Sequence, residues 1–429
     1  MRNSQDMNPV KAIVVGAGHR SMIYASYAQT HPDELQIVGV AEPDDTRRAI
    51  CQEMYRIPAA HTFRTAEELA KAPRFADAII NGTMDRLHVA TSLPLLDRGY
   101  AMLLEKPFAC SREEADALSD CVRRNNSKVM ICHVLRYSKF YEGIKRVVAS
   151  GRIGDVINLQ TSEDVSYHHY ANSYVRGKWA RSEESGTTML LAKCCHDIDL
   201  ITWMMDGVTP VSVTSAGSLS YFRPENAPAD AGTRCMVDCP HVNDCHLSAK
   251  RIYLDLPHKW DFYVWPTMMD APDAEKVAFL RDESPYGRCA YKCGNNVADR
   301  QNVLIRFENG AVCSHCLTGG SAYSKRIMRV IGTKGQIEGV FEDQSFTIST
   351  IDPEPDGDCR QEVIDLSDDC SAFVNHGGGD IALVTDFVRY VRGQQTSISC
   401  TELEGSMLGH RIIYAADLSM QNGGCPVTP

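Results

Sequence analysis

The sequence predicts an α/β protein of two domains: a doubly wound parallel sheet, followed by an α+β domain with a mostly antiparallel open sheet. Two observations support this prediction. Short β-branched runs alternate with helix-length amphipathic stretches through residues 1–136, and longer strand-like runs joined by turn signals occur in residues 137–429. A chain of 429 residues is also too long for one ordinary core, so two domains are expected.

The elements of the first domain follow one another as buried strands that each precede a helical stretch. The first strand ends in glycines and leads into a helix that is expected to run to about residue 30. Alternation at this spacing favours right-handed βαβ units and therefore a parallel sheet. The predicted strands cover residues 11–15, 36–41, 76–81, 101–105 and 128–132.

The second domain is predicted from longer strands and two closing helices. Strand-like runs lie at 156–160, 302–307 and 328–333, and Glu308-Asn-Gly is a hairpin turn signal, which favours antiparallel pairing. Helical stretches near 380–393 and 403–421 end the chain. Residues from about 221 to 298 are rich in Pro, Asp, Cys and aromatics with weak periodicity, and we interpret them as a Cys-rich insertion.

Composition excludes several classes of function. Hydrophobic residues make up 44% and charged residues 23%, as in ordinary globular proteins. The formal net charge of −11 argues against a nucleic-acid partner, because neutralising phosphates requires a basic face. The polar start lacks the apolar core of a signal peptide, and no run reaches the roughly 18 apolar residues of a membrane span. We therefore expect a cytoplasmic protein with no membrane partner.

A glycine motif after the first strand predicts dinucleotide binding. Gly16 permits a tight turn, and Gly18 lets the backbone approach a pyrophosphate at the start of the next helix. Ser21 replaces the usual third Gly or Ala and is small enough for close packing. Glu42 ends the second strand, where a carboxylate bonds the ribose hydroxyls and repels a 2′-phosphate. This favours a Rossmann domain that binds NAD, although Arg47 and Arg48 lie near enough to accommodate the phosphate of NADP.

Several further motifs occur in a specific order, and with them the chain resembles the Gfo/Idh/MocA family of oxidoreductases. They are Leu104-Glu105-Lys106-Pro107, Thr83 through His88, His133-Val-Leu-Arg136-Tyr137, Ser150-Gly-Arg-Ile-Gly154, Trp179 and His196-Asp-Ile-Asp199. The resemblance implies a nicotinamide cofactor, NAD(H), and places the lysine of Glu-Lys-Pro between nicotinamide and substrate. The residues it assigns to the cofactor are Gly16, Gly18, His19, Arg20, Ser21, Glu42, Thr83, His88, Glu105 and Lys106.

Lys106 and His196 are the predicted catalytic residues. Oxidation of an alcohol carbon requires a base for the hydroxyl proton while hydride leaves to the nicotinamide. A lysine beside the positively charged ring should have a lowered pKa, and a histidine titrates near neutral pH without special help. Asp199 lies three residues after His196, so on a helix both would project toward one ligand. A surface lysine and a helix-capping histidine are the structural alternatives.

The motif departs from the family at one position. Most members carry an aspartate four residues before the histidine, and here that residue is Ala192, followed by Lys193 and a pair of cysteines. This suggests a specialised subgroup. Residues 167–176 are dense in hydroxyl-binding side chains, which suit a sugar or polyol, although a solvated loop explains them as well. The predicted substrate-binding residues are Arg136, His168, His169, Tyr174, Arg176 and Asp199.

Seventeen cysteines are many for a reducing compartment. Those scattered singly are interpreted as small buried hydrophobes. In the insertion, the grouped cysteines favour either a structural zinc site or reduced thiols over disulfides, and His241 is a further candidate ligand. The group is Cys235-x3-Cys239-x5-Cys245 followed by Cys289-x3-Cys293. The predicted ligands are Cys235, Cys239, Cys245 and one of Cys289 or Cys293, with Cys289 as the first choice.

These residues suggest three alternative functions. The first is an NAD-dependent dehydrogenase that oxidises or reduces a hydroxyl of a sugar, sugar derivative or cyclitol. The second is an NAD-dependent glycosidase or lyase that oxidises a ring carbon transiently, eliminates, adds water and re-reduces. The third, a sensor that holds NAD as a regulatory ligand, is disfavoured by the presence of Lys106 and His196. The resemblance also implies a homo-oligomer, a dimer or tetramer, because the open sheet of such second domains commonly packs against another subunit.

Overall fold

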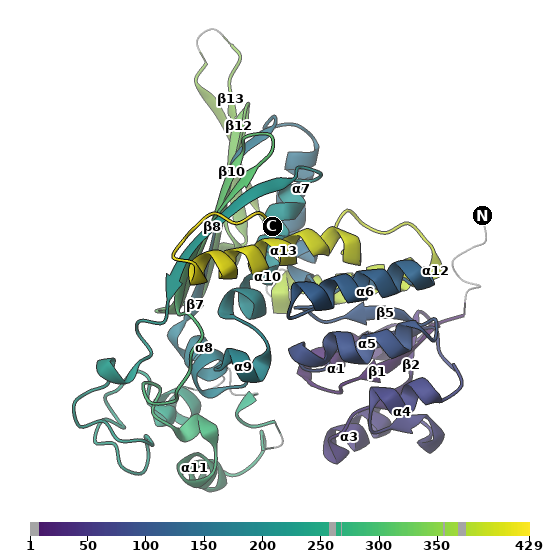
Figure 1. Ribbon diagram of the computed structural model, residues 1–429, viewed down its shortest axis with the longest axis vertical. Coiled ribbons are helices and arrows are strands. Elements are labelled where there is room, and N and C mark those ends of the chain that lie inside the picture. Colours follow the sequence, from purple (N-terminus) through teal and green to yellow (C-terminus); the bar gives the residue numbers. More distant parts are fainter. Residues whose placement is uncertain (1–7, 257–262, 267, 355–356, 368–374) are drawn as a thin grey trace.

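A computed structural model describes residues 8–256, 263–266, 268–354, 357–367 and 375–429. Two sheets organise it: a six-stranded parallel sheet with helices on its faces, and an eight-stranded mixed sheet in the second part of the chain (Figure 1). The predicted fold class is confirmed. A helix of the second part of the chain, residues 189–204, contacts the loop at the carboxyl end of β5 (Ala101–Leu104) through Ala192 and Lys106, so residues from both parts can share one site.

The first sheet has the strand order β3-β2-β1-β4-β5-β6 and is parallel throughout. Its strands are buried on both faces, which explains their continuous apolar runs. Strand order reverses between β1 and β4, and doubly wound sheets bind ligands in the crevice at that switch point. The strands are β1 (Val10–Val15), β2 (Leu35–Ala41), β3 (Thr62–Phe63), β4 (Ala78–Asn81), β5 (Ala101–Leu104) and β6 (Val129–Ile131).

Side-chain caps begin several helices of the first domain. The side chains of Asp44, Thr65 and Ser111 each accept a hydrogen bond from the backbone N–H three residues on, which satisfies an otherwise orphaned donor. The helix predicted to reach residue 30 is divided at Ser26. The helices are α1 (His19–Ala25), α2 (Tyr27–Thr30), α3 (Asp45–Tyr55), α4 (Ala66–Lys71), α5 (His88–Leu96) and α6 (Arg112–Asn125).

The second sheet has the order β14-β13-β12-β11-β7-β10-β9-β8. All neighbours are antiparallel except the central pair β7 and β10, which is parallel. The predicted Asn-Gly turn joins β9 to β10, and burial alternates strictly along β9, as expected for a sheet with one covered face. The strands are β7 (Val156–Ser166), β8 (Pro210–Ser218), β9 (Arg300–Phe307), β10 (Val312–Ser321), β11 (Lys325–Gly332), β12 (Gly335–Val340), β13 (Ser345–Ile351) and β14 (Cys359–Asp365).

Helix α10 forms the centre of the second domain and packs on the inner side of this sheet. Every residue of α10 is buried except Lys193, because the helix lies between β7, β10 and the C-terminal helix. Its N-cap is Thr188, whose hydroxyl accepts from the backbone N–H of Leu191. The helices of this region are α7 (Lys139–Ala149), α8 (Tyr167–Tyr170), α9 (Ser182–Ser185) and α10 (Met189–Met204).

The Cys-rich segment is inserted between β8 and β9. It contains α11 (Asp273–Asp282) and short helical turns, and an isolated bridge between Arg234 and Arg288 joins its two ends. Ile252, Trp265 and Leu280 are buried in the same apolar cluster as α10. The insertion is therefore part of the second core.

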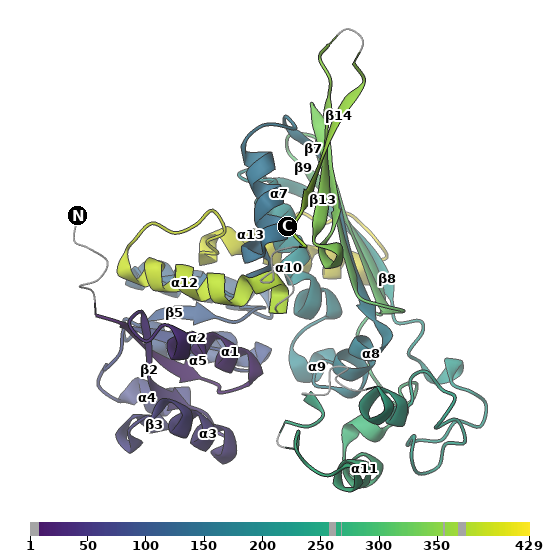
Figure 2. The ribbon, with the colours of Figure 1, turned by 180° about the vertical axis from the view of Figure 1, so that it is seen from behind.

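The last two helices, α12 (Gly379–Arg392) and α13 (Leu403–Gln421), return to the first domain. Leu383 and Phe387 of α12 belong to the apolar cluster of β1, and Leu403 and Met407 of α13 to that of β5. Figure 2 shows α12 lying over the first sheet. None of the helices in the described ranges combines the length and the apolarity required to cross a bilayer.

Candidate functional site

The glycine turn after β1 has the geometry of a ligand-binding loop. Gly16 has φ +77°, and a Cβ there would lie 2.9 Å from Cα of Thr83, so only glycine fits. A Cβ at Gly18 would meet nothing within 4 Å. The space beside Gly18 is open, at the carboxyl end of β1 where a phosphate group would approach the backbone.

Ser21 occupies a tightly packed position beneath this turn. It is fully buried, and its Oγ lies 2.1 Å from where a Cβ of Gly82 would stand. Any side chain at position 82 would therefore clash with Ser21. The residue that replaces the third glycine of the motif thus packs α1 directly against the loop after β4.

Glu42 accepts hydrogen bonds from the glycine loop. The backbone N–H of Ala17 donates to Oε2 at 2.7 Å, and that of Asp44 donates to Oε1 at 2.9 Å. Arg48 donates to the carbonyl of Glu42 and forms an ion pair with Asp45. The carboxylate therefore lies at the end of β2 as expected, and the nearby guanidinium is already neutralised.

His88 links two loops at the carboxyl edge. Its Nδ1 lies 2.7 Å from the carbonyl oxygen of Pro107 and its Nε2 lies 3.0 Å from that of Thr83. The Oγ1 of Thr83 donates to Asn81, which keeps the loop after β4 close to its strand. The described contacts of His88 therefore position the loop that carries Lys106.

An ion-pair network connects α1 with the first turn of α12. Arg20 donates to Oε1 of Glu105 at 3.1 Å and forms an ion pair with Asp380, while Tyr24 donates to the same Oε1 at 2.6 Å. Oε2 of Glu105 accepts from the backbone N–H of Lys106 at 2.8 Å. Burial works against ionisation, but the Arg20 and Lys106 cations outweigh it and lower the pKa of Glu105. Both oxygens of Glu105 are thus occupied by the protein itself.

The same network includes two residues outside the predicted site. Nδ1 of His376 lies 3.2 Å from Oδ2 of Asp380. Burial raises the pKa of Asp380, but the contacts with His376 and Arg20 outweigh it and lower this pKa to about 2. The only sequence signal for this segment was its run of glycines before a helix, which is equally typical of an interdomain turn. The ion pair of Asp380 with Arg20 joins residues 360 apart in the chain.

Lys106 lies where the two domains meet. It follows β5, is half-buried, and its Nζ donates to the carbonyl of Ala192 in α10 at 3.0 Å. The residue that departs from the family motif therefore contacts the predicted catalytic lysine through its backbone. His196 lies one helical turn further along α10.

His196 is buried, with ring centroids 5.7 Å from His133 and 6.4 Å from His376. Burial, followed by the Lys106 cation and the neighbouring histidines, lowers the pKa of His196 well below 6.5. The expectation that this imidazole titrates near neutral pH is wrong: it is held neutral because a second positive charge beside Lys106 is unfavourable.

Asp199 does not project toward the same ligand as His196. Nε of Arg136 donates to its Oδ2 at 2.7 Å and Nη2 donates to its Oδ1 at 2.6 Å, and both residues are buried. A bidentate pair occupies both oxygens and leaves neither group open to a substrate. The expectation of substrate contact through Arg136 and Asp199 is corrected accordingly: the pair fastens the segment after β6 to α10.

Residues 167–176 are mostly buried and helical, and do not form the solvated loop that was the alternative. His169 and Tyr174 are buried, His168 is half-buried, and the run continues from α8 into a π-helical turn at Ala171–Arg176. Arg176 donates to the carbonyls of Arg288 and Leu247, so it points into the insertion. Its predicted role in substrate binding is corrected to anchoring the insertion.

A second charged group lies on the same helix. Nζ of Lys193 is 3.4 Å from Glu163, and Arg326 pairs with both Glu163 and Asp197. All these side chains are largely buried. Burial lowers the pKa of Lys193, and Glu163 opposes the shift. These charges line the inner side of β7 and β11, and none of them was predicted as site residues.

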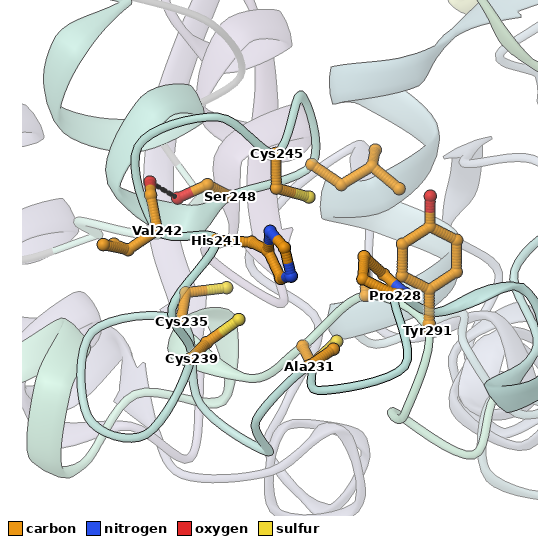
Figure 3. A pocket seen from close by; sticks show the side chains of 12 residues that line it. Pro228, Ala231, Cys235, Cys239, His241, Val242, Cys245, Ser248 and Tyr291 are labelled. Carbon is orange, nitrogen blue, oxygen red and sulfur yellow. Dashed lines mark hydrogen bonds between the residues drawn. The ribbon is translucent and has the colours of Figure 1, made fainter.

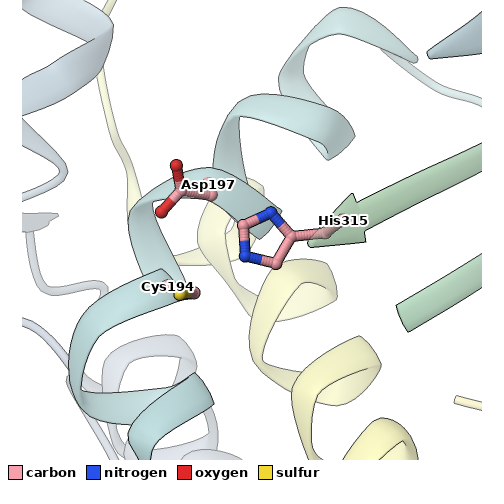
Figure 4. Close-up of side chains that lie close together, drawn as sticks. All are labelled: Cys194, Asp197 and His315. Carbon is pink, nitrogen blue, oxygen red and sulfur yellow. The ribbon is translucent and has the colours of Figure 1, made fainter. Parts of the chain in front are cut away.

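The predicted metal ligands lie apart from Lys106. Cys235, Cys239, Cys245 and Cys289 all line one small cavity in the insertion (Figure 3). A different trio, Cys194, Asp197 and His315, has ligand atoms within 4.8 Å of one another under α10 (Figure 4).

Two family models match the chain. One is described as the oxidoreductase family with an NAD-binding Rossmann fold and matches residues 10–133, and the other as the C-terminal alpha/beta domain of the oxidoreductase family and matches residues 145–428. The Bacillus subtilis protein YteT is 23% identical over 391 residues, which cover 85% of each chain. Trans-1,2-dihydrobenzene-1,2-diol dehydrogenase of Xenopus tropicalis is 28% identical over 184 residues, 43% of this chain and 53% of that protein.

A solved structure shares the whole fold. The inositol dehydrogenase homologue of Azotobacter vinelandii, complexed with NADH and myo-inositol, superposes with a TM-score of 0.67. The match covers 98% of both chains at 15% identity. At 15% sequence identity this match shows a shared fold.

Proposed function

The chain belongs to the Gfo/Idh/MocA family of NAD-binding oxidoreductases, and from that premise we propose that it is an NAD-dependent dehydrogenase of a sugar, sugar derivative or cyclitol hydroxyl. The observation that carries the proposal is the contact of Lys106 with α10: its Nζ donates to the carbonyl of Ala192, one turn from His196, just after β5 at the carboxyl edge of the parallel sheet.

The described residues fit a bound dinucleotide. The open space beside Gly18 and the close packing of Gly16 and Ser21 suit a pyrophosphate at the glycine turn. When bound, the nicotinamide accepts or donates the hydride. Glu42 supports NAD over NADP, because its carboxylate lies after β2 beside the glycine turn, where it would repel a 2′-phosphate, and Arg48 is already paired with Asp45.

Lys106 and His196 divide the handling of the hydroxyl proton. A neutral His196 can accept the proton or orient the hydroxyl, and its buried Nδ1 has no partner among the described residues. The group that accepts the hydroxyl proton in the oxidation returns it in the reduction, so His196 would serve both directions while Lys106 donates a hydrogen bond to the same oxygen. Lys193 and His168, both incompletely buried, are the side chains we assign to the remaining hydroxyls.

Two relatives support the substrate class by their names, one a diol dehydrogenase and the other an inositol dehydrogenase homologue seen with myo-inositol. Neither name supports the glycosidase alternative. The dehydrogenase is therefore the function that we propose.

A substrate screen tests the proposal. Free sugars, sugar acids, cyclitols and aryl glycosides are incubated with NAD or NADP, and NADH absorbance and aglycone release are followed together. We expect stoichiometric NADH from a free polyol with no glycoside cleaved. Aglycone release with hydrogen exchange at the carbon beside the oxidised one, and without net NADH, would replace the dehydrogenase by the glycosidase. Tighter binding of NADP would overturn the role given to Glu42.

A further inference from the structure

Four cysteines of the insertion line a single cavity. Cys235, Cys239 and Cys245 come from one loop (Figure 3). Cys289, near the end of the insertion, also lines the cavity. The cavity has a volume of about 10 Å³, the space of one water molecule or one ion. None of the cysteines in the described ranges forms a disulfide.

A buried cation beside the thiols, Arg176, forms no ion pair with an acidic side chain among the described residues. Arg176 is 2% exposed and donates to two carbonyl oxygens, that of Leu247 at 2.6 Å and that of Arg288 at 2.8 Å, and its guanidinium lies over the ring of Tyr253. Its Nη2 also lies 3.8 Å from Sγ of Cys235, and its Nη1 is buried without a partner among the described residues. A guanidinium stays charged, and a buried charge requires an opposite one. Thiolates at Cys235 and its neighbours would supply that charge.

Two other candidate ligands are occupied. The Cys293 thiol donates to the carbonyl of Cys289 at 3.1 Å and does not line the cavity. His241 lines it, but its Nε2 is 2.7 Å from Asp230 and its Nδ1 is 3.4 Å from Asp244. The choice between Cys289 and Cys293, which spacing leaves open, is decided by these contacts.

The trio Cys194, Asp197 and His315 is a weaker cation site, although its ligand atoms are closer together (Figure 4). Nε of Arg326 lies 3.4 Å from Oδ1 of Asp197, and Lys193 adjoins Cys194 in the chain. The positive charges of Arg326 and Lys193 would repel a metal ion bound to this trio. The cavity in the insertion has one cation, Arg176, beside several thiols.

We propose that this cavity is a structural zinc site, in which one Zn²⁺ is held by the thiolates of Cys235, Cys239, Cys245 and Cys289, with Arg176 as the counter-ion. Four thiolates are a standard tetrahedral set for zinc, and each thiol releases its proton on binding. In the described residues only the α10 trio has three ligand atoms within 4.8 Å of one another, so binding of one ion would have to draw the four cysteine side chains of the cavity closer together. The ion would fasten the insertion to the π-helical turn that ends at Arg176.

Elemental analysis of the full chain, purified without added metal or a metal-binding tag, tests the site. We expect about one zinc per chain. Cys235→Ser and Cys245→Ser should lose nearly all of it, whereas Cys293→Ser, a matched cysteine of the same segment, should keep it. Growth with Co²⁺ provides a readout without substitutions: the wild-type chain should show the thiolate charge-transfer and ligand-field bands of a tetrahedral Co²⁺ site.

Several outcomes would overturn the proposal. Folded wild-type protein with well under one zinc and with these thiols free to titrate would leave reduced cysteines. Iron with acid-labile sulfide would mean a cluster in place of a single ion. Loss of zinc in Cys293→Ser as complete as in Cys289→Ser would refute the ligand set. None of these measurements depends on enzymatic activity, so they stand apart from the proposed dehydrogenase.

Discussion

His196 has Lys106, His133, His376 and Arg326 as charged or titratable neighbours, and all of them add to burial in disfavouring its protonation. A single histidine in a sequence suggests a group that titrates near neutral pH, but here its environment keeps it a neutral acceptor. The environment also decides the role of Asp199, because both of its carboxylate oxygens accept hydrogen bonds from Arg136. The partner of each side chain, more than its type, decides what chemistry it can do.

Substitutions at Lys106 and His196 test their roles. Lys106→Ala and His196→Ala should each lower kcat by about 10²–10⁴-fold, because each removes a group that handles the hydroxyl proton. NADH affinity, measured by fluorescence titration, should change little. Lys71→Ala, at an exposed lysine of α4, is the control and should behave as wild type. Near-normal turnover in either variant would remove that residue from the mechanism.

At the scale of elements, the glycine turn joins β1, α1 and the loop after β4. Gly16 meets Thr83, and Ser21 meets Gly82, so two close contacts hold the turn in place. Gly18 makes no comparable contact. The first glycine therefore serves the fold, while the second is available to a ligand.

Alanine substitutions should separate these two functions. Gly16→Ala forces a side chain onto a φ of +77° and against Thr83, and should lower the free energy of unfolding by about 1–3 kcal/mol. Gly18→Ala should change stability by less than about 0.5 kcal/mol but weaken NADH binding about tenfold or more. Denaturant unfolding and fluorescence titration measure both. Wild-type NADH affinity in Gly18→Ala would show that the pyrophosphate lies elsewhere.

At the scale of the whole molecule, the two domains are joined by more than the chain segment at residues 134–138. Helix α12 returns to cover the first sheet, and Arg20 pairs with Asp380 just inside α12. The junction also buries histidines from several elements, among them His133, His196 and His410. The stability of the molecule should therefore respond to the protonation of this region.

Acid should destabilise the protein before its carboxylates titrate. Burial is the main cause that holds the pKa of His133, His169, His196 and His410 well below 6.5. Below about pH 6.5 the unfolded chain binds more protons than the folded one, so the free energy of unfolding falls as the pH decreases. Each such histidine contributes about 1.4 kcal/mol per pH unit. Asp417, whose pKa burial raises to about 6, gains a proton in the folded state and offsets part of the loss.

Urea unfolding at about pH 7.5, about pH 6.5 and about pH 5.5 measures this slope. His410→Gln removes one buried imidazole and should reduce the slope by about 1.4 kcal/mol per pH unit. His31→Gln, at a half-buried histidine of the first domain, is the control. A free energy of unfolding that does not change across this range would show that these histidines keep ordinary pKa values.

The sequence by itself determined the features that are local in the chain. Apolar runs predicted the parallel sheet, Gly16 and Gly18 predicted the turn after β1, and the spacing of cysteines predicted a grouped set in an insertion, because neighbouring residues suffice for each. Tertiary structure alone decided which side chains meet. It paired Arg136 with Asp199, turned Arg176 toward the insertion, and brought Asp380 to Arg20 across 360 residues of chain. Burial and charge depend on such distant neighbours, so the neutral state of His196 could not be predicted from its motif.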